Sequence, residues 1–203
     1  IFTCIISTIF VLSVAYSMSR MRFKMRKPFM NIAMIIGLFP SFMSMIAVYY
    51  ILRALNLADG AMIRVALIIV FSAGSGAGFY VAKGFFDTIS KSLDEAAIID
   101  GATRWNVFTK ITVPLSKPII VYTILTSFMG PWVDFIFGKV ICRADAQYYT
   151  VSIGLWKMLE KEYIDSWYTC FAAGAVVVSI PIAILFLMTQ KFYVEGMSGA
   201  VKG

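Results

Sequence analysis

The amino-acid sequence predicts an all-α protein, a polytopic membrane bundle of five spanning helices with one long amphipathic loop. The first observation is composition: 60% of the 203 residues are apolar and only 14% are charged, unlike a soluble domain. The second is that apolar runs long enough to cross a bilayer, which takes about 20 residues, recur along the chain. The third is a single long stretch, residues 84–117, that is both charged and helically patterned. We therefore predict one membrane domain over residues 1–203.

The first span is predicted over residues 1–19, which carry no charge and are followed at once by five basic residues. Basic residues after the apolar run are typical of a stop-transfer flank, whereas a signal peptide carries them before it. The chain begins at isoleucine inside this run, so we expect a preceding segment to be missing. The second span, residues 28–52, contains Pro40, which predicts a kink.

Three further spans follow. The third, residues 65–82, contains the small-residue run from Gly74 to Gly78. A phosphate-cradling loop would need a strand before it, so this run is better explained as a helix-packing motif. The fourth span covers residues 119–138 and the fifth residues 166–190. We expect the tail, residues 191–203, to lack a helix-forming run because of its glycines.

The loop over about residues 84–117 is predicted to hold two helices. In the first, apolar residues recur at steps of three or four, and Gly101 ends the helix as a C-terminal glycine does. The second begins near Trp105 and ends at Val113-Pro114, because proline restricts the residue before it. The apolar surface of the first helix is formed by Phe85, Phe86, Ile89, Leu93, Ala96, Ala97 and Ile98.

The basic residues predict the orientation in the membrane. Residues 20–27, the loop over 83–117 and the tail hold twelve Lys and Arg residues together, and the two connections on the other side hold six. The positive-inside rule therefore places the amphipathic loop and the C-terminus in the cytoplasm.

Other function classes are disfavoured. The net charge of +7 does not indicate nucleic-acid binding, because the basic residues lie between apolar runs rather than on one folded surface. Histidine is absent, and Cys4, Cys142 and Cys170 are odd in number and far apart, so no metal site or redox pair is predicted. An enzyme is not expected either, and no phosphate-binding loop for ATP is present in the sequence.

Motif spacing within the loop resembles a known family. Glu95-Ala96-Ala97, then Gly101, then Ile111 and Val113-Pro114 resemble the EAA loop of binding-protein-dependent ABC importer permeases, although the family usually has leucine in place of Val113. An ordinary amphipathic helix on the membrane surface would not require this spacing. The resemblance covers essentially the whole chain and is closest to the carbohydrate branch, in particular the smaller permease of maltose/maltodextrin importers. The resemblance also rests on Arg22-Phe23, the segment SFMGPWVDF and the ending GAVKG.

The resemblance implies a specific assembly in the bacterial plasma (inner) membrane. Such subunits have six spans and pair with a second permease, a cytoplasmic ATPase dimer and an extracellular sugar-binding protein. ATP and Mg would be bound by the ATPase, with no cofactor in this chain. The residues implied to dock on the ATPase are Leu93, Glu95, Ala96, Ala97, Gly101 and Trp105, with Gly199 and Lys202 of the tail.

Each docking role has a simpler alternative. Glu95 can be a solvated helix charge, and Trp105 can lie at the bilayer interface. The tail can be an ordinary disordered terminus.

Substrate contacts are predicted from residue type. A sugar needs aromatic faces and polar groups, which selects Asn31, Tyr49, Tyr50 and Trp132. Asp134 is unusual for a span, so it lines the translocation path, binds a partner helix or lies at the outer membrane edge near Lys139. The predicted function is therefore a permease subunit of an ATP-driven sugar importer, with malto-oligosaccharide as the expected sugar. The alternatives are the same fold importing a polyol or glycerol phosphate, or a stand-alone secondary transporter.

Overall fold

All the secondary structure of the described residues is helical. The computed structural model describes residues 1–39, 41–74, 78–143, 145–160 and 164–200, without the side chains of 41, 42 and 193–200. The first half comprises α1 (Phe2–Arg20), α2 (Arg26–Gly37), α3 (Ser41–Ala54), α4 (Met62–Gly74), α5 (Phe79–Thr88), α6 (Lys91–Ile99) and α7 (Arg104–Val107). A π-helical turn (Phe108–Thr112) then leads to α8 (Val113–Leu115), α9 (Lys117–Val133), α10 (Ile136–Cys142), a 3₁₀ turn (Ala146–Tyr148), α11 (Val151–Lys157) and α12 (Ile164–Ala200). The prediction of an all-α bundle is confirmed.

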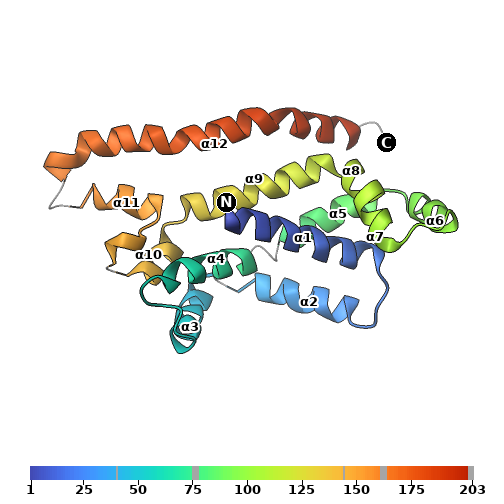
Figure 1. Ribbon diagram of the computed structural model, residues 1–203, viewed down its shortest axis with the longest axis horizontal. Coiled ribbons are helices and arrows are strands. Elements are labelled where there is room, and N and C mark those ends of the chain that lie inside the picture. Colours follow the sequence, from blue (N-terminus) through green and yellow to red (C-terminus); the bar gives the residue numbers. More distant parts are fainter. Residues whose placement is uncertain (40, 75–77, 144, 161–163, 201–203) are drawn as a thin grey trace.

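The helices form an elongated bundle with two distinct ends (Figure 1). The connection between α1 and α2, the pair α6 and α7, and the C-terminal end of α12 lie together at one end of the long axis, which we call the loop end. Helices α3, α10 and α11 lie toward the other end. This arrangement agrees with the topology predicted from the basic residues, which puts the same three segments on one side.

Two apolar clusters form the core. The first joins α1, α5 and α9 through buried side chains that include Ala15, Phe79, Phe86 and Ile119. The second joins α3, α4, α10 and α11 through Leu52, Ile63, Ile141 and Ile153. Helix α12 packs mainly along α9 and α11, and the part of it long enough to cross a membrane has no buried residue. Its apolar surface is that of a helix facing lipid or another protein.

The spans differ in continuity. Within the described residues, two helices are long and apolar enough to cross a membrane, α1 and α12, or up to four if each bent pair counts as one span. The predicted third span consists of α4 and α5, which meet at an angle of 41°. The predicted second span comprises α2 and α3, and the kink expected at Pro40 lies outside the described residues. The number of spans in the membrane stays a prediction.

The prediction of one continuous helix from Phe85 to Gly101 is wrong. Helix α5 ends at Thr88, Ile89 is extended with ψ of 128°, and Ser90 is the N-cap of α6, which begins at Lys91. The Ser90 hydroxyl accepts a hydrogen bond from the Ser92 amide at 3.3 Å, which favours a new helix start over continuation of α5. The loop therefore has a corner where the apolar periodicity shows none.

The predicted end at Val113-Pro114 is also wrong. The backbone stays helical through Leu115, and the sharp turn of 85° into α9 follows it. A π-helical turn precedes Pro114, in which the Val113 amide donates to the Phe108 carbonyl. We attribute the tolerance of Pro114 to this wider turn, because a proline ring clashes with the carbonyl four residues earlier in a regular helix.

Two further predictions need correction. The fourth span is interrupted, since α9 ends at Val133 and α10 begins at Ile136. The tail is helical through Ala200, although glycines weaken a helix by about 1 kcal/mol each. Helix propagation from a long apolar segment adds one backbone hydrogen bond per residue, which explains why two glycines without a proline do not stop it.

Candidate functional site

Helix α6 is the short, separately capped element that carries the motif. It has only nine residues, fewer than an isolated helix needs to be stable. At its C-terminal end, the Gly101 amide donates to the Ile98 carbonyl at 3.0 Å and the Ala102 amide to the Ala97 carbonyl at 2.9 Å. Gly101 has a φ of +85°, which a residue with a side chain rarely adopts. The prediction that Gly101 ends this helix is confirmed.

Helix α7 begins directly after this turn. The Thr103 hydroxyl accepts a hydrogen bond from the Asn106 amide at 3.2 Å and so caps the new helix. The Tyr16 hydroxyl of α1 donates to the Arg104 carbonyl at 3.3 Å. The Tyr16 ring lies 4.7 Å from that of Phe108, centre to centre. These contacts attach α7 to the end of α1.

Arg20, the last residue of α1, holds the corner between α5 and α6. Its Nη2 donates to the carbonyl oxygens of Phe86 and Ile89 at 3.0 and 2.8 Å, at the end of α5. The Phe86 carbonyl also accepts from the Ile89 amide at 3.3 Å. Its Nε lies 3.2 Å from Oδ2 of Asp94 in α6. The side chains of Arg20 and Asp94 are only 3% and 13% exposed, so this ion pair is far less screened than a surface pair. One guanidinium therefore joins three helices.

A second polar contact lies beside it. The Ser19 hydroxyl donates to Oδ1 of Asp87 at 2.6 Å, and Nζ of Lys83 lies 2.5 Å from Oδ2 of the same carboxylate. Asp87 is thus shared between α1 and its own helix. Together with Arg20, it attaches the root of the loop to α1.

The outer side of α6 and α7 is apolar and exposed. Leu93 is 45% exposed, Trp105 69% and Ile99 85%. Ala96 and Glu95 are also exposed, and Ala97 is partly buried. Phe86, in contrast, is fully buried in the core with α1, and Phe85 and Ile89 pack against that core. The prediction that Phe86 contributes to the apolar surface of the loop helix is therefore wrong, because it is buried against α1, whereas Phe85 and Ile89 are partly exposed.

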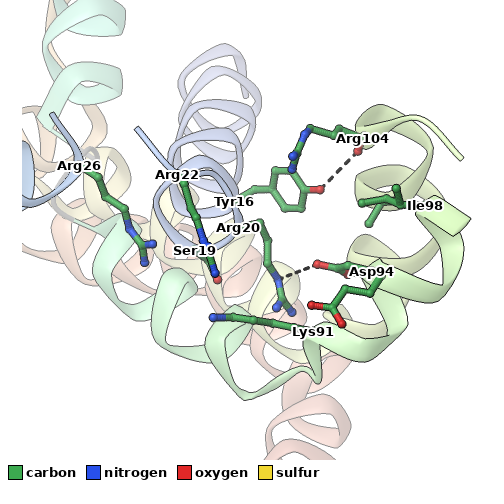
Figure 2. A pocket seen from close by; sticks show the side chains of 11 residues that line it. Tyr16, Ser19, Arg20, Arg22, Arg26, Lys91, Asp94, Ile98 and Arg104 are labelled. Atoms are coloured by element: carbon green, nitrogen blue, oxygen red, sulfur yellow. Dashed lines mark hydrogen bonds and ion pairs between the residues drawn. The ribbon is translucent and has the colours of Figure 1, made fainter. Parts of the chain in front are cut away.

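Glu95 is one of the residues that line a cavity of about 420 Å³ between α1, α6 and α7. The lining is strongly basic: Arg20, Arg22, Arg26, Lys91 and Arg104 contribute to it, beside Asp94 and Glu95. Figure 2 shows the Asp94 carboxylate pointing at Arg20, with Arg26 at the left of the view. Glu95 itself makes no ion pair within the described part of the chain.

The predicted substrate residues do not gather in one place. Asn31 is exposed on α2, and Tyr49 and Tyr50 lie next to each other on α3 with ring centres 5.7 Å apart. Trp132 lies on α9, where its Nε1 donates to the Val178 carbonyl of α12 at 3.2 Å. The Trp132 ring also stacks on Phe128. The sugar-contact role of all four stays a prediction.

Asp134 has a structural partner. Its Oδ2 accepts a hydrogen bond from the Gly138 amide at 2.8 Å and so caps the first turn of α10. It also lines a cavity of about 390 Å³ with Ser7 and Phe71. Lys139, its expected neighbour, instead pairs with Glu160 at 3.7 Å.

The predicted packing motif has a neighbouring helix close to Gly78 but not to Gly74, and Cys142 is the buried one of the three cysteines. Gly78 would bring an added Cβ within 3.9 Å of Val11 in α1, whereas Gly74 meets no atom within 4 Å, and residues 75–77 lie outside the description. The three cysteines are free thiols. Within the described ranges, no three His, Cys, Asp or Glu side chains are grouped so as to hold a metal ion.

Sequence reasoning missed three residues of this site. Arg20 reads as one of several flanking charges, and Asp94 as a flanking helix charge. No pattern in the sequence reveals that they meet, because they are separated by 74 positions along the chain. Ile99 could have been found, since it follows the motif directly as an apolar residue at the end of the helix. The predicted tail contact at Gly199 lies in the helical tail, and Lys202 lies outside the described residues.

Comparisons with known proteins agree with this geometry. Residues 8–197 match the family described as binding-protein-dependent transport system inner membrane component. The galactooligosaccharides transport system permease protein GanQ of Bacillus subtilis is 35% identical over 205 residues, covering 100% of this chain and 71% of that protein. The maltose/maltodextrin transport system permease protein MalG of Escherichia coli is 32% identical over 193 residues, covering 93% of this chain. This chain spans 64% of the length of that MalG protein.

A solved structure shows the same architecture. A chain in the crystal structure of a bacterial ABC transporter involved in the import of the acidic polysaccharide alginate superimposes with a TM-score of 0.76 and 26% identity. The match covers 95% of this chain and 70% of that one.

Proposed function

We propose that this chain, which belongs to the family of binding-protein-dependent transport system inner membrane components, is a permease subunit of an ATP-driven oligosaccharide importer. It is a transport component rather than an enzyme, since the relatives are transport-system permease proteins. The relatives named for galactooligosaccharides and for maltodextrin support a neutral oligosaccharide as cargo, with malto-oligosaccharide as the favoured class. A polyol or glycerol phosphate is the alternative cargo on the same fold.

The observation that carries the proposal is the exposed apolar face of α6 and α7. Leu93, Ile99 and Trp105 expose large apolar area on these two helices, and Glu95 of α6 carries a carboxylate with no ion pair within the described residues. Exposed apolar side chains next to a charge are suited to a protein partner, where burial supplies affinity and the charge fixes the register. A stand-alone secondary transporter would have no need of such a face. We assign it to a cytoplasmic ATPase, with Ala96, Ala97 and Gly101 allowing close approach.

The contacts at the root of the loop supply a mechanism. ATP and Mg would be bound by an ATPase dimer, whose closure would push α6 and α7. Arg20 and Tyr16 would pass that displacement to α1, since both join the loop to this helix. Helix α1 lies in one core with α5 and α9, so the bundle would alternate between inward-open and outward-open states.

The orientation follows from the loop end. Residues 20–27, α6 and α7, and the end of α12 lie together there. Residues 20–27, the loop over 83–117 and the tail hold twelve of the eighteen Lys and Arg residues. We place the loop end, including the C-terminus, in the cytoplasm of a bacterial cell. The other partners would be a second permease and an extracellular sugar-binding protein. Gly199 and Lys202 stay proposed contacts of the tail with the ATPase.

Charge reversal at Glu95 tests the proposal. In the reconstituted complex, Glu95→Lys should lower sugar uptake at least about tenfold, as expected when one partner of an interfacial charge pair is reversed. Gly101→Asp should do the same, because its φ of +85° disfavours a side chain. Uptake of labelled malto-oligosaccharide and substrate-stimulated ATP hydrolysis would be measured together.

The matched control is Asp59→Lys, which reverses an exposed charge outside the loop end. It should leave both rates at the wild-type level. Wild-type uptake and ATP hydrolysis in Glu95→Lys would remove the docking role from α6.

A further inference from the structure

The basic cavity between α1, α6 and α7 holds more positive charge than its own carboxylates neutralise. Five basic and two acidic residues line its 420 Å³. Asp94 is already engaged by Arg20, and Glu95 is the residue proposed to face the ATPase. Arg22, Arg26 and Lys91 make no ion pair among the residues that the structure describes. Like charges gathered in one cavity repel one another, and a bound anion would relieve that repulsion.

Arg20 adds an unsatisfied donor to this wall. Its side chain is 3% exposed, and its Nη1 has no hydrogen-bond partner among the described residues. A buried guanidinium nitrogen without an acceptor is costly, and phosphate oxygens are favourable acceptors for arginine. A cavity of this size lies within the range of about 300–1,000 Å³ that holds small ligands.

We propose that this cavity binds a phosphate group, carried either by an anionic phospholipid or by inorganic phosphate. Arg22, Arg26 and Lys91 provide the charge, and Arg20 provides a donor from the buried wall. Arg20 and Arg22, which line the cavity, lie at and just beyond the end of α1, a helix long enough to span a membrane, so we place the cavity near the depth of the lipid phosphates. The lipid source rests on the proposed membrane function, whereas the phosphate site rests on the side chains alone.

The test compares two double variants of the complete purified transporter. R22A/R26A removes two cavity residues, and K24A/K27A removes the same charge from exposed residues of the same segment that do not line the cavity. Native mass spectrometry would measure binding of dioleoyl phosphatidylglycerol and of the zwitterionic dioleoyl phosphatidylcholine. Equilibrium dialysis with radiolabelled inorganic phosphate would test the free anion.

The wild-type protein should bind phosphatidylglycerol selectively, and R22A/R26A should weaken this binding by roughly tenfold or more, since a direct charge-assisted contact with the phosphate is lost at each position. K24A/K27A should stay within about threefold of wild type, because charge outside the cavity acts only through screened attraction. Loss of inorganic phosphate binding in R22A/R26A, with lipid binding unselective, would support the same site with a soluble ligand.

Two outcomes would overturn the proposal. If the wild type, R22A/R26A and K24A/K27A all bind phosphatidylglycerol equally and all bind inorganic phosphate equally, the cations of the cavity form an ordinary solvated surface. Dissociation of the ATPase from R22A/R26A, with ligand binding unchanged, would assign the cavity to a protein contact. Neither readout measures sugar uptake, so a failure here is distinct from a failure of the Glu95 test.

Discussion

Helices α6 and α12 reach their conformations by opposite means. Helix α6 has nine residues and depends on a cap at Ser90, a left-handed turn at Gly101 and an ion pair from α1. Helix α12 has 37 residues, and its membrane-length part has no buried residue. A long apolar helix needs little from its neighbours, because its own backbone hydrogen bonds and the surrounding lipid satisfy it. A short polar helix takes its position from tertiary contacts, and those same contacts enable it to transmit motion.

The largest effect is expected at the contact that holds α6. Arg20→Ala leaves the Asp94 carboxylate without its ion-pair partner and removes the Arg20 donor from the Ile89 carbonyl. Breaking a buried ion pair costs about 3–5 kcal/mol, so the melting temperature of the purified complex should fall clearly. The double variant R20A/D94A should recover much of this loss, because no lone buried charge remains.

A charge removed from α12 provides the control for this prediction. Lys191 is exposed, so Lys191→Ala should change the free energy of unfolding by no more than about 0.5 kcal/mol. If Arg20→Ala melts at the wild-type temperature, α6 does not depend on α1 and the contrast with α12 disappears.

A smaller effect is expected at the turn after α6. Gly101→Ala should lower stability by about 1–2 kcal/mol, because alanine is unfavourable at a φ of +85°. Gly84→Ala is the matched substitution inside α5, where an added Cβ meets no atom within 4 Å. That change should leave stability unchanged or raise it by up to about 1 kcal/mol. Equal melting temperatures of the two variants would contradict the left-handed turn.

The smallest effect is expected where α12 is attached. Trp132→Phe removes the hydrogen bond from Nε1 to the Val178 carbonyl and keeps an aromatic ring next to Phe128. The cost should be about 1 kcal/mol, seen as a small fall in the melting temperature with uptake retained. A collapse of uptake in this variant would instead place Trp132 in the sugar path.

The contrast between α6 and α12 also explains which elements can be predicted from the sequence. The apolar runs predict α1 and α12 because length and composition decide such helices on their own. Gly101 is predictable because its turn is local. The break between Thr88 and Ser90 is not, since the apolar periodicity continues through it and the partner that stabilises it, Arg20, lies far away in the sequence.

The predicted ends of the spans are wrong for a related reason. Asp134 reads as a residue within a span, but its carboxylate caps α10, and the span is interrupted there. The predicted position of the exposed apolar surface differs from the observed one for the same reason. Phe86 carries the right apolar character, yet the corner at Ser90 turns it into the core while Ile99 takes the most exposed position.

The central claim is that the pair Arg20 and Asp94 transmits motion from the loop to α1. The most direct measurement is the number of sugar molecules imported per ATP hydrolysed by the reconstituted R20A/D94A transporter. The double variant keeps no buried lone charge, so folding and ATPase binding should survive and can be verified by purification of the intact complex. We predict that ATP hydrolysis continues while imported sugar per ATP falls at least about fivefold, the effect of losing about 1 kcal/mol of coupling. A wild-type ratio in the intact double variant would contradict the claim and reduce the pair to a structural contact.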